Sequence, residues 1–477
     1  MSQTETKGLK TGALGMVGLS ILGAAMMCPA IGIYLNWGPM ASLVGLATPL
    51  VFLAALVIAL PSAISYSQLS SRMTSSGAVF AWSWRILSPK VGVWTGIIMT
   101  FFYIVATILQ PILFGMFFND LLSLMGVEAP GMLTWGIGAA LITLVVMYAT
   151  YNGISISIKT ALVFIAIELV VVFALLLTIL FTGASHGIGL TLSPYNPANI
   201  QGGGNAFWSA MIFGILSFAG FDVIQTAAEE TKTPTKIIPK ATILVVVIVG
   251  LFWAVGSWIF SISEPLDKVQ DLMASGFTPA TAIAEDYWGA GKILVDLTSM
   301  TALGGALVAC AVGASRVLFA QGRQGTLPAF MGEVHPTKQV PTKALHVVWA
   351  ATILGTGLVT VWLGNANSAF VWWAGSIAFF ALLTYFFVHM SSMVYFWKKK
   401  EFNWFIHGVI PVVGMALVLY LINRTFLTAL WALDWKGGKS IVVFGFVPCV
   451  AGLIYVLLPS KKLKAVLAGP APEVEEA

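Results

Sequence analysis

Twelve long apolar segments run through this chain of 477 residues and constrain its fold more than any other feature. Each is about 20 residues or longer, enough for a helix to cross a hydrocarbon core of roughly 30 Å. The chain is 58% hydrophobic and 9% charged, whereas soluble domains carry about 25% charged residues. We therefore predict an all-α integral membrane protein with spans near 15–37, 41–66, 90–122, 132–150, 157–182, 204–231, 240–262, 291–320, 344–363, 368–396, 404–423 and 440–459.

The Lys and Arg residues are distributed unevenly between the two sides of these predicted spans. With the N-terminus inside, 19 of them fall on the inner side and 5 on the outer side. Inner loops of membrane proteins are enriched in Lys and Arg. We therefore expect a multi-pass protein of the cytoplasmic (inner) membrane, with both termini in the cytoplasm.

No motif for enzymatic or nucleic-acid chemistry is found in the sequence. It contains no phosphate-binding glycine loop, no GxSxG motif, no cluster of metal ligands and no aromatic and basic nucleic-acid surface. Cys28, Cys310 and Cys449 are scattered through apolar segments, without the spacing of a metal site or a disulfide framework. We expect neither an enzyme nor a protein that binds a metal, a cofactor or nucleic acid.

Span six contains the stretch FGILSFAGFDVIQTAAEETKTP, which interrupts its own apolar pattern. Small residues occur at Ser217, Ala219 and Gly220, and Asp222 follows them. Lipid forms no hydrogen bonds, so backbone freed from a helix at membrane depth must face protein or a water-filled cavity. Broken helices hold the substrate in many transporters. We therefore predict a break in span six with a binding site around it.

Span one carries a similar signal in VGLSILGAAMMCPAIGIYLNWG. Ser20, Gly23, Ala24 and Ala25 are small, and Pro29 follows about one turn later. Small residues also suit close packing of membrane helices, and for span one alone both interpretations stay open. Breaks in the first and sixth spans, each the first of its five-span half, are the pattern of a five-plus-five inverted repeat.

Three motifs resemble those of the amino acid-polyamine-organocation transporter superfamily. FAGFDVIQTAAEETKTPTKIIPKAT resembles the span-six signature, in which F-x-G-F-D or F-E is followed by E-E and later by I-P. GASRVLFAQGRQGTLPAFMGEVHPTKQVPTKAL is similar to the span-eight exit, and ISYSQLSSRMTSSGAVFAW resembles the span-two exit. The motifs occur in the family's order, so the resemblance covers essentially the whole chain.

The resemblance implies a LeuT-like fold: ten core helices in two inverted five-helix repeats, with broken helices 1 and 6, and two peripheral helices. Mapped onto this chain, residues 1–14 are a cytoplasmic N-terminal segment and 15–396 the transport core. Residues 397–460 hold peripheral helices 11 and 12. Residues 461–477 combine a basic cluster, Gly-Pro-Ala-Pro and an acidic end, and we expect them to be a disordered cytoplasmic tail.

The resemblance also implies alternating access and an amino acid or amine as substrate. Its carboxylate would bind N–H groups of the span-one loop, and its ammonium the freed carbonyls of span six. By position, the substrate-binding residues are Ser20, Ile21, Leu22, Gly23, Ala24, Ala25, Tyr103, Leu216, Ser217, Phe218, Ala219 and Gly220, with Phe218 or Tyr103 as the gating aromatic. The chain departs from the family in its LGAAMM loop, where G-S-G or G-x-G followed by I-F is usual, and at Leu216, which is often aromatic.

Glu168 lies in the middle of span five, in VFIAIELVVV. Ionisable residues at membrane depth are costly and mark proton relays or similar function. In several members of the superfamily the aligned position carries a Lys that contacts the span-one loop. One hypothesis is that Glu168 takes up and releases a coupling proton while holding span one. The alternative is a protonated Glu that clamps two helices together.

The remaining acidic and basic candidates are assigned to structure or gating. Asp222 would cap the second half-helix of span six or act as a gate residue. Glu229, Glu230, Arg316 and Arg323 fall near the cytoplasmic side and would form an inner gate of ion pairs.

The substrate class follows from the few carboxylates at membrane depth. A second positive charge on the substrate would need an acidic partner, and Glu168 and Asp222 have other assignments. We expect a secondary active transporter that imports or exchanges a neutral amino acid, with a proton as the coupling ion and the lipid bilayer as surroundings. A polyamine or cationic amino acid transporter or antiporter is the alternative, and a receptor that moves no ligand is a third class. Sodium coupling and oligomeric state stay open.

Overall fold

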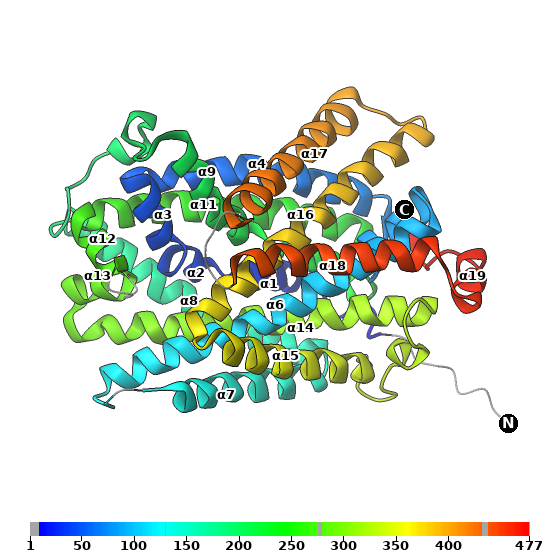
Figure 1. Cartoon of the computed structure of the whole chain (residues 1–477), viewed down its shortest axis with the longest axis horizontal. Coiled ribbons are helices and arrows are strands. Elements are labelled where there is room, and N and C mark those ends of the chain that lie inside the picture. Colours follow the sequence, from blue (N-terminus) through cyan, green and yellow to red (C-terminus); the bar gives the residue numbers. More distant parts are fainter. Residues whose placement is uncertain (1–8, 129, 275–278, 432–436, 477) are drawn as a thin grey trace.

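The computed structural model describes residues 9–128, 130–274, 279–431 and 437–476. They form a bundle whose long helices lie side by side (Figure 1). Up to the middle of the chain the helices are α1 (Met16–Met27), α2 (Pro29–Tyr34), α3 (Trp37–Val44), α4 (Thr48–Ser70), α5 (Val79–Ile86), α6 (Pro89–Leu124), α7 (Met132–Tyr151), α8 (Ile154–Phe181), α9 (Gly203–Phe218), α10 (Val223–Thr226) and α11 (Pro234–Ser263).

The second half continues with the same kind of long helix. Its helices are α12 (Leu266–Ala274), α13 (Pro279–Trp288), α14 (Ile293–Gln324), α15 (Thr342–Leu363), α16 (Ala366–Lys398), α17 (Ile410–Leu421), α18 (Gly438–Leu457) and α19 (Lys461–Ala468), with π-helical turns at Trp404–Val409 and Ile422–Leu430 flanking α17. Strands β1 (Met73–Thr74) and β2 (Glu475–Glu476) form one antiparallel pair. Within the described residues, twelve helical segments are long and apolar enough to cross a membrane, which confirms the predicted all-α membrane fold.

Two pairs of helices five spans apart pack closely against each other. Span two (α4) lies along span seven (α11), and span three (α6) lies along span eight (α14), in the two most extensive helix contacts of the bundle. An inverted five-plus-five repeat produces this pairing, because its pseudo-two-fold axis brings equivalent helices together. Spans one and six are both broken, as expected.

Both described ends of the chain lie at one end of the bundle, together with α19, while α12 and α13 lie at the other end (Figure 1). We call these ends the terminal face and the opposite face. The division into a core at 15–396 and peripheral helices at 397–460 stays a prediction. Of the predicted N-terminal segment 1–14, residues 1–8 lie outside the described residues.

The expectation of a disordered tail at 461–477 is wrong for the described part, 461–476. Residues Lys461–Ala468 form α19, whose first turn is capped by the Ser460 hydroxyl accepting from the Leu463 N–H at 3.2 Å. Leu463 is buried, and β2 pairs with β1. Composition predicted disorder because the segment is polar, but tertiary contacts with the rest of the protein order it.

A small charged cluster on the opposite face joins the end of α11 to α12 and α13. Glu264 is almost completely buried, and its Oε2 accepts from Lys268 Nζ at 3.1 Å. Lys268 also pairs with Asp286 of α13. Burial, together with the neighbouring Asp286, raises the pKa of Glu264 to about 7, although Lys268 opposes the shift.

Stability should therefore fall as the pH rises through this range. Below about pH 7 folded Glu264 holds a proton that the unfolded chain releases above its ordinary pKa of 4.5, so raising the pH from about 5 to 8 favours unfolding. We expect E264Q to weaken this decrease in the thermal unfolding midpoint. E285Q, which removes an exposed carboxylate of α13 paired with Lys292, should keep the wild-type pH profile; an unchanged profile in E264Q would refute the assignment.

Candidate functional site

Span one breaks at Cys28. Helix α1 ends at Met27, Cys28 adopts a left-handed φ of 56°, and α2 begins at Pro29. Proline has no N–H and disfavours helical backbone in the preceding residue. In a continuous helix the Ala25 carbonyl would accept from the N–H of residue 29. Because residue 29 is Pro29, this helical hydrogen bond is missing at the break.

The loop expected at Ser20–Ala25 is wrong, because these residues lie inside α1. Their small size serves packing instead: a Cβ at Gly23 would lie 2.6 Å from the Cδ1 of Ile224 in span six. Pro29 was the sequence signal for the true position of the break, since a proline at the first position of a helix marks where that helix begins.

Span six breaks between α9 and α10. Helix α9 ends at Phe218, Ala219 is extended with ψ 126°, and Gly220 has φ 113°. Only glycine adopts that φ without strain. The break predicted from Ser217, Ala219 and Gly220 is therefore confirmed, and the interrupted residues are 219–222.

The two breaks touch each other. A Cβ at Gly220 would lie 2.6 Å from the Cγ of Met26, so the glycine also permits close approach of span six to span one. Asn36, at the end of span one, donates through Nδ2 to the Ser217 hydroxyl at 2.8 Å. The irregular backbone of both spans is thus held within protein, as the absence of hydrogen-bonding lipid requires.

A cavity of about 60 Å³ lies beside the two breaks. This volume is several times the roughly 10–15 Å³ that one water needs. Its wall is largely apolar, its polar side chains are Asn36, Gln110 and Ser217, and no carboxylate is among its described lining residues. The lining is Met26, Met27, Cys28, Ile31, Gly32, Leu35, Asn36, Phe102, Ala106, Leu109, Gln110, Leu113, Leu216, Ser217, Ala219, Cys310, Phe370 and Ile377.

Glu168 connects span five to the break in span one. Its side chain is 1% exposed, and Oε1 accepts from the Ala30 N–H at 2.5 Å. Ala30 is the second residue of α2, so the carboxylate takes the place of a helical carbonyl for a backbone donor next to the break. The predicted contact between Glu168 and span one is present, while the proton-coupling role stays a prediction.

Asp222 differs from the predicted helix cap. It occupies the position before α10, but its side chain makes no capping hydrogen bond there. Instead its Oδ2 accepts from the Tyr103 hydroxyl of span three at 2.6 Å. Asp222 therefore ties the break in span six to α6, and Tyr103 serves as its partner rather than as part of the cavity wall.

A cluster of aromatic rings lies next to Asp222. Phe221 packs against Tyr385 with ring centroids 5.4 Å apart, and Tyr66 packs on Phe221 at 5.5 Å. All three side chains are buried. They fill the space between spans two, six and ten with rigid groups.

The four predicted gate residues form two ion pairs between spans six and eight. Arg316 contacts Glu230 through Nε and Nη2 at 3.0 and 2.9 Å, and both side chains are at most 1% exposed. Arg323 contacts Glu229 at 2.8 Å in a partly exposed pair. Two parallel hydrogen bonds fix the geometry of the buried pair as well as neutralising its charges.

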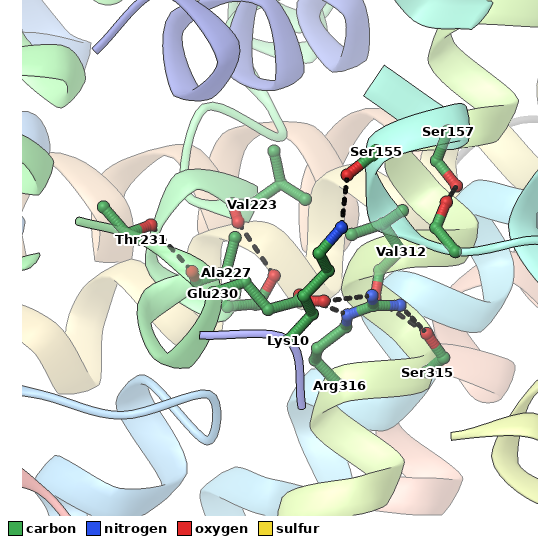
Figure 2. A network of polar contacts seen from close by, with 12 residues as sticks. Lys10, Ser155, Ser157, Val223, Ala227, Glu230, Thr231, Val312, Ser315 and Arg316 are labelled. Atoms are coloured by element: carbon green, nitrogen blue, oxygen red, sulfur yellow. Dashed lines mark hydrogen bonds and ion pairs between the residues drawn. The ribbon is translucent and has the colours of Figure 1, made fainter. Parts of the chain in front are cut away.

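Leu14, near the described start of the chain, is bonded to the segment that carries Glu230. The Leu14 N–H donates to the Glu230 carbonyl at 2.9 Å, and the Lys232 N–H donates to the Leu14 carbonyl at 2.8 Å. Figure 2 shows the Lys10 side chain, whose Nζ donates to the Ser155 hydroxyl at 3.4 Å, together with the hydrogen bonds between Arg316 and Glu230. The pair is therefore enclosed on several sides by protein.

Of the predicted substrate-binding residues, only three line the cavity: Leu216, Ser217 and Ala219. Phe218 packs against Trp253 with ring centroids 5.0 Å apart. Sequence reasoning missed most of the cavity wall, which comes from spans three, eight and ten as well as from residues 26–36. The sequence did offer a sign that Gln110 belongs to a site, because it is a polar residue inside an apolar run, directly before Pro111.

Comparisons with known proteins place these features in a family context. Residues 14–432 match the family described as "Amino acid permease". The chain is 26% identical to the low-affinity putrescine importer PlaP of Escherichia coli, over 97% of this chain and 96% of that protein. It is also 26% identical to the branched-chain amino acid permease BcaP of Bacillus subtilis, over 69% of this chain and 70% of BcaP.

The two ion pairs should differ strongly in their contribution to stability. E230A leaves the buried guanidinium of Arg316 without its partner, which costs about 3–5 kcal/mol. E229A removes one partner of an exposed pair, worth about 1 kcal/mol or less. We expect a much larger decrease in the thermal unfolding midpoint of purified E230A than of E229A. Equal decreases would contradict this distinction.

Proposed function

Because the chain belongs to the amino acid permease family, we propose that it is a secondary transporter that carries a neutral amino acid through the cavity beside its two helix breaks. The observation that carries this proposal is the composition of the cavity wall, which is apolar and has no carboxylate among its described residues. The backbone groups freed at the two breaks would bind the ionic ends of the zwitterion.

The side chain of the substrate would face the apolar part of the wall. Leu109, Leu113, Phe370 and Ile377 supply much of it, which suits an aliphatic or other apolar side chain. A relative named as a branched-chain amino acid permease supports this choice. A diamine would bring a second ammonium into a wall that offers it no carboxylate, and an unpaired buried charge is costly.

An amine is the second candidate, and one comparison favours it. The relative that matches over 97% of this chain is named as a putrescine importer. Asp222 is the carboxylate at the span-six break, where it binds Tyr103. A diamine could be accommodated if this carboxylate turned from Tyr103 toward the cavity.

We propose that the terminal face is cytoplasmic, as the excess of Lys and Arg on that side predicts. The two ion pairs, the aromatic rings next to Asp222 and the start of the chain all lie between the cavity and that face in this proposal. The protein would then be described in a state closed to the cytoplasm, and transport would require spans six and eight to separate.

Proton coupling is assigned to Glu168. Its carboxylate holds the Ala30 N–H directly after the break in span one. Protonation removes the negative charge that makes such a hydrogen bond strong, so it would loosen the hold on α2. In this proposal the proton and the geometry of span one are linked through a single contact.

The substrate class can be tested by thermal stabilisation of the purified protein. A ligand that binds the folded state raises its unfolding midpoint. We expect leucine, isoleucine or valine to raise the midpoint at pH 5.5 and 7.5, and putrescine to leave it unchanged. Stabilisation by putrescine alone would establish the second candidate.

The coupling proposal can be tested with E168Q in proteoliposomes. Gln keeps a hydrogen-bond acceptor for the Ala30 N–H but cannot titrate. We expect E168Q to lose accumulation driven by a pH gradient while retaining exchange of substrate across the membrane. E333Q, which removes an exposed carboxylate paired with Lys343, is the control and should accumulate normally. Normal accumulation by E168Q would refute the assignment.

A further inference from the structure

The C-terminal segment, residues 461–476, lies docked on the terminal face. Leu463 of α19 and Pro472 are buried. At its end β2 pairs with β1, in the register Met73 with Glu476 and Thr74 with Glu475. We call this segment the strap. Its β2 end is anchored to the connection between spans two and three.

Arg85 strengthens that first anchor. Its Nε donates to the Pro472 carbonyl at 2.9 Å, and its Nη1 contacts Glu476 at 3.1 Å. Arg85 belongs to α5, directly before span three. One guanidinium therefore binds both the backbone and the acidic end of the strap.

A second anchor lies at the end of span eight. Gln324 donates through Nε2 to the Pro470 carbonyl at 2.7 Å, and Arg323 contacts Glu473 at 3.4 Å. These two residues are the last of α14. The strap therefore crosses from the span-two exit to the span-eight exit, two sites that lie far apart in the sequence.

The second anchor is shared with the ion pairs between spans six and eight. Arg323 contacts Glu229 as well as Glu473, and the Ser76 hydroxyl donates to Glu229 at 2.6 Å. Ser76 follows β1, which carries the β2 end of the strap. The contacts thus form a closed ring that includes the partly exposed ion pair: β1, Ser76, Glu229, Arg323, Glu473, β2 and back to β1.

We infer that the strap keeps spans six and eight together at the terminal face and so keeps the cavity closed to that face. Release of the strap favours opening of the cavity there. The inference rests on the proposed function only in requiring that the cavity opens there. Separation of span six from span eight must break the Glu229 contact with Arg323, and the strap opposes this by tying Arg323 to the span-two exit.

The strap is suited to reversible release. Its ion pairs lie at the surface, with the side chains of Glu473 and Glu476 82% and 62% exposed. Exposed pairs are weak and are screened by salt. The strap therefore shifts the balance between closed and open states without locking either of them.

Two native cysteines allow a test that needs no substrate. Cys28 and Cys310 line the cavity, whereas Cys449 is buried in α18 and lies outside its lining. A membrane-impermeant maleimide is added to vesicles from the terminal face, and labelling of each cysteine is followed by peptide mass spectrometry. Cys449 serves as the internal reference for general loosening of the protein.

Two altered proteins remove the strap contacts in different ways. One ends at Ala468 and lacks β2; the other is E473Q/E476Q, which keeps the chain and loses both ion pairs. We expect labelling of Cys28 and Cys310 to rise about three- to tenfold, the range expected for loss of two exposed pairs. Labelling of Cys449 should stay unchanged.

E475Q is the matched control. Glu475 also lies in β2, but it forms no ion pair among the described residues. It should label like the wild type. The charge exchange R85E/E476R should label less than R85E alone, since it restores one anchor. Unchanged cavity labelling in both the shortened chain and E473Q/E476Q would overturn the inference, as would an equal rise at Cys449. Neither result depends on which substrate is carried.

Discussion

Lipid cannot satisfy a backbone hydrogen bond, and the arrangement of this protein depends on that constraint. Two spans are nevertheless interrupted at membrane depth. Protein groups hold the interrupted backbone: Glu168 accepts from the Ala30 N–H after the first break, and the Val223 N–H donates to the Gly220 carbonyl at the second, where Asp222 also accepts from Tyr103. Both breaks lie within the bundle, where such partners are available. The cavity is located where the two interruptions meet.

The same two carboxylates connect the broken spans to neighbouring helices. Glu168 joins span five to the backbone of span one through its hydrogen bond from the Ala30 N–H. Asp222 connects span six to span three through one phenol hydroxyl. Each contact links a broken span to a continuous one.

The ion pairs between spans six and eight are graded from the interior to the surface. The inner pair, Arg316 and Glu230, is enclosed by protein, and its strength depends on complete pairing. The outer pair, Arg323 and Glu229, is partly exposed and shares its guanidinium with the C-terminal segment. Loss of a partner is costly in an enclosed pair and costs little in an exposed one.

The sequence by itself determined the twelve spans, the break in span six and the family resemblance, because hydropathy, glycine and motif spacing are local properties. It also contained Pro29, the local cause of the break in span one, although the small residues before it favoured an earlier position. Only the tertiary structure decided that Met26 meets Gly220, that Gln110 and Phe370 enter the cavity wall, and that the polar tail is ordered. Those features are contacts between distant segments, whose partners are fixed by packing in three dimensions and leave no periodic signal along the chain.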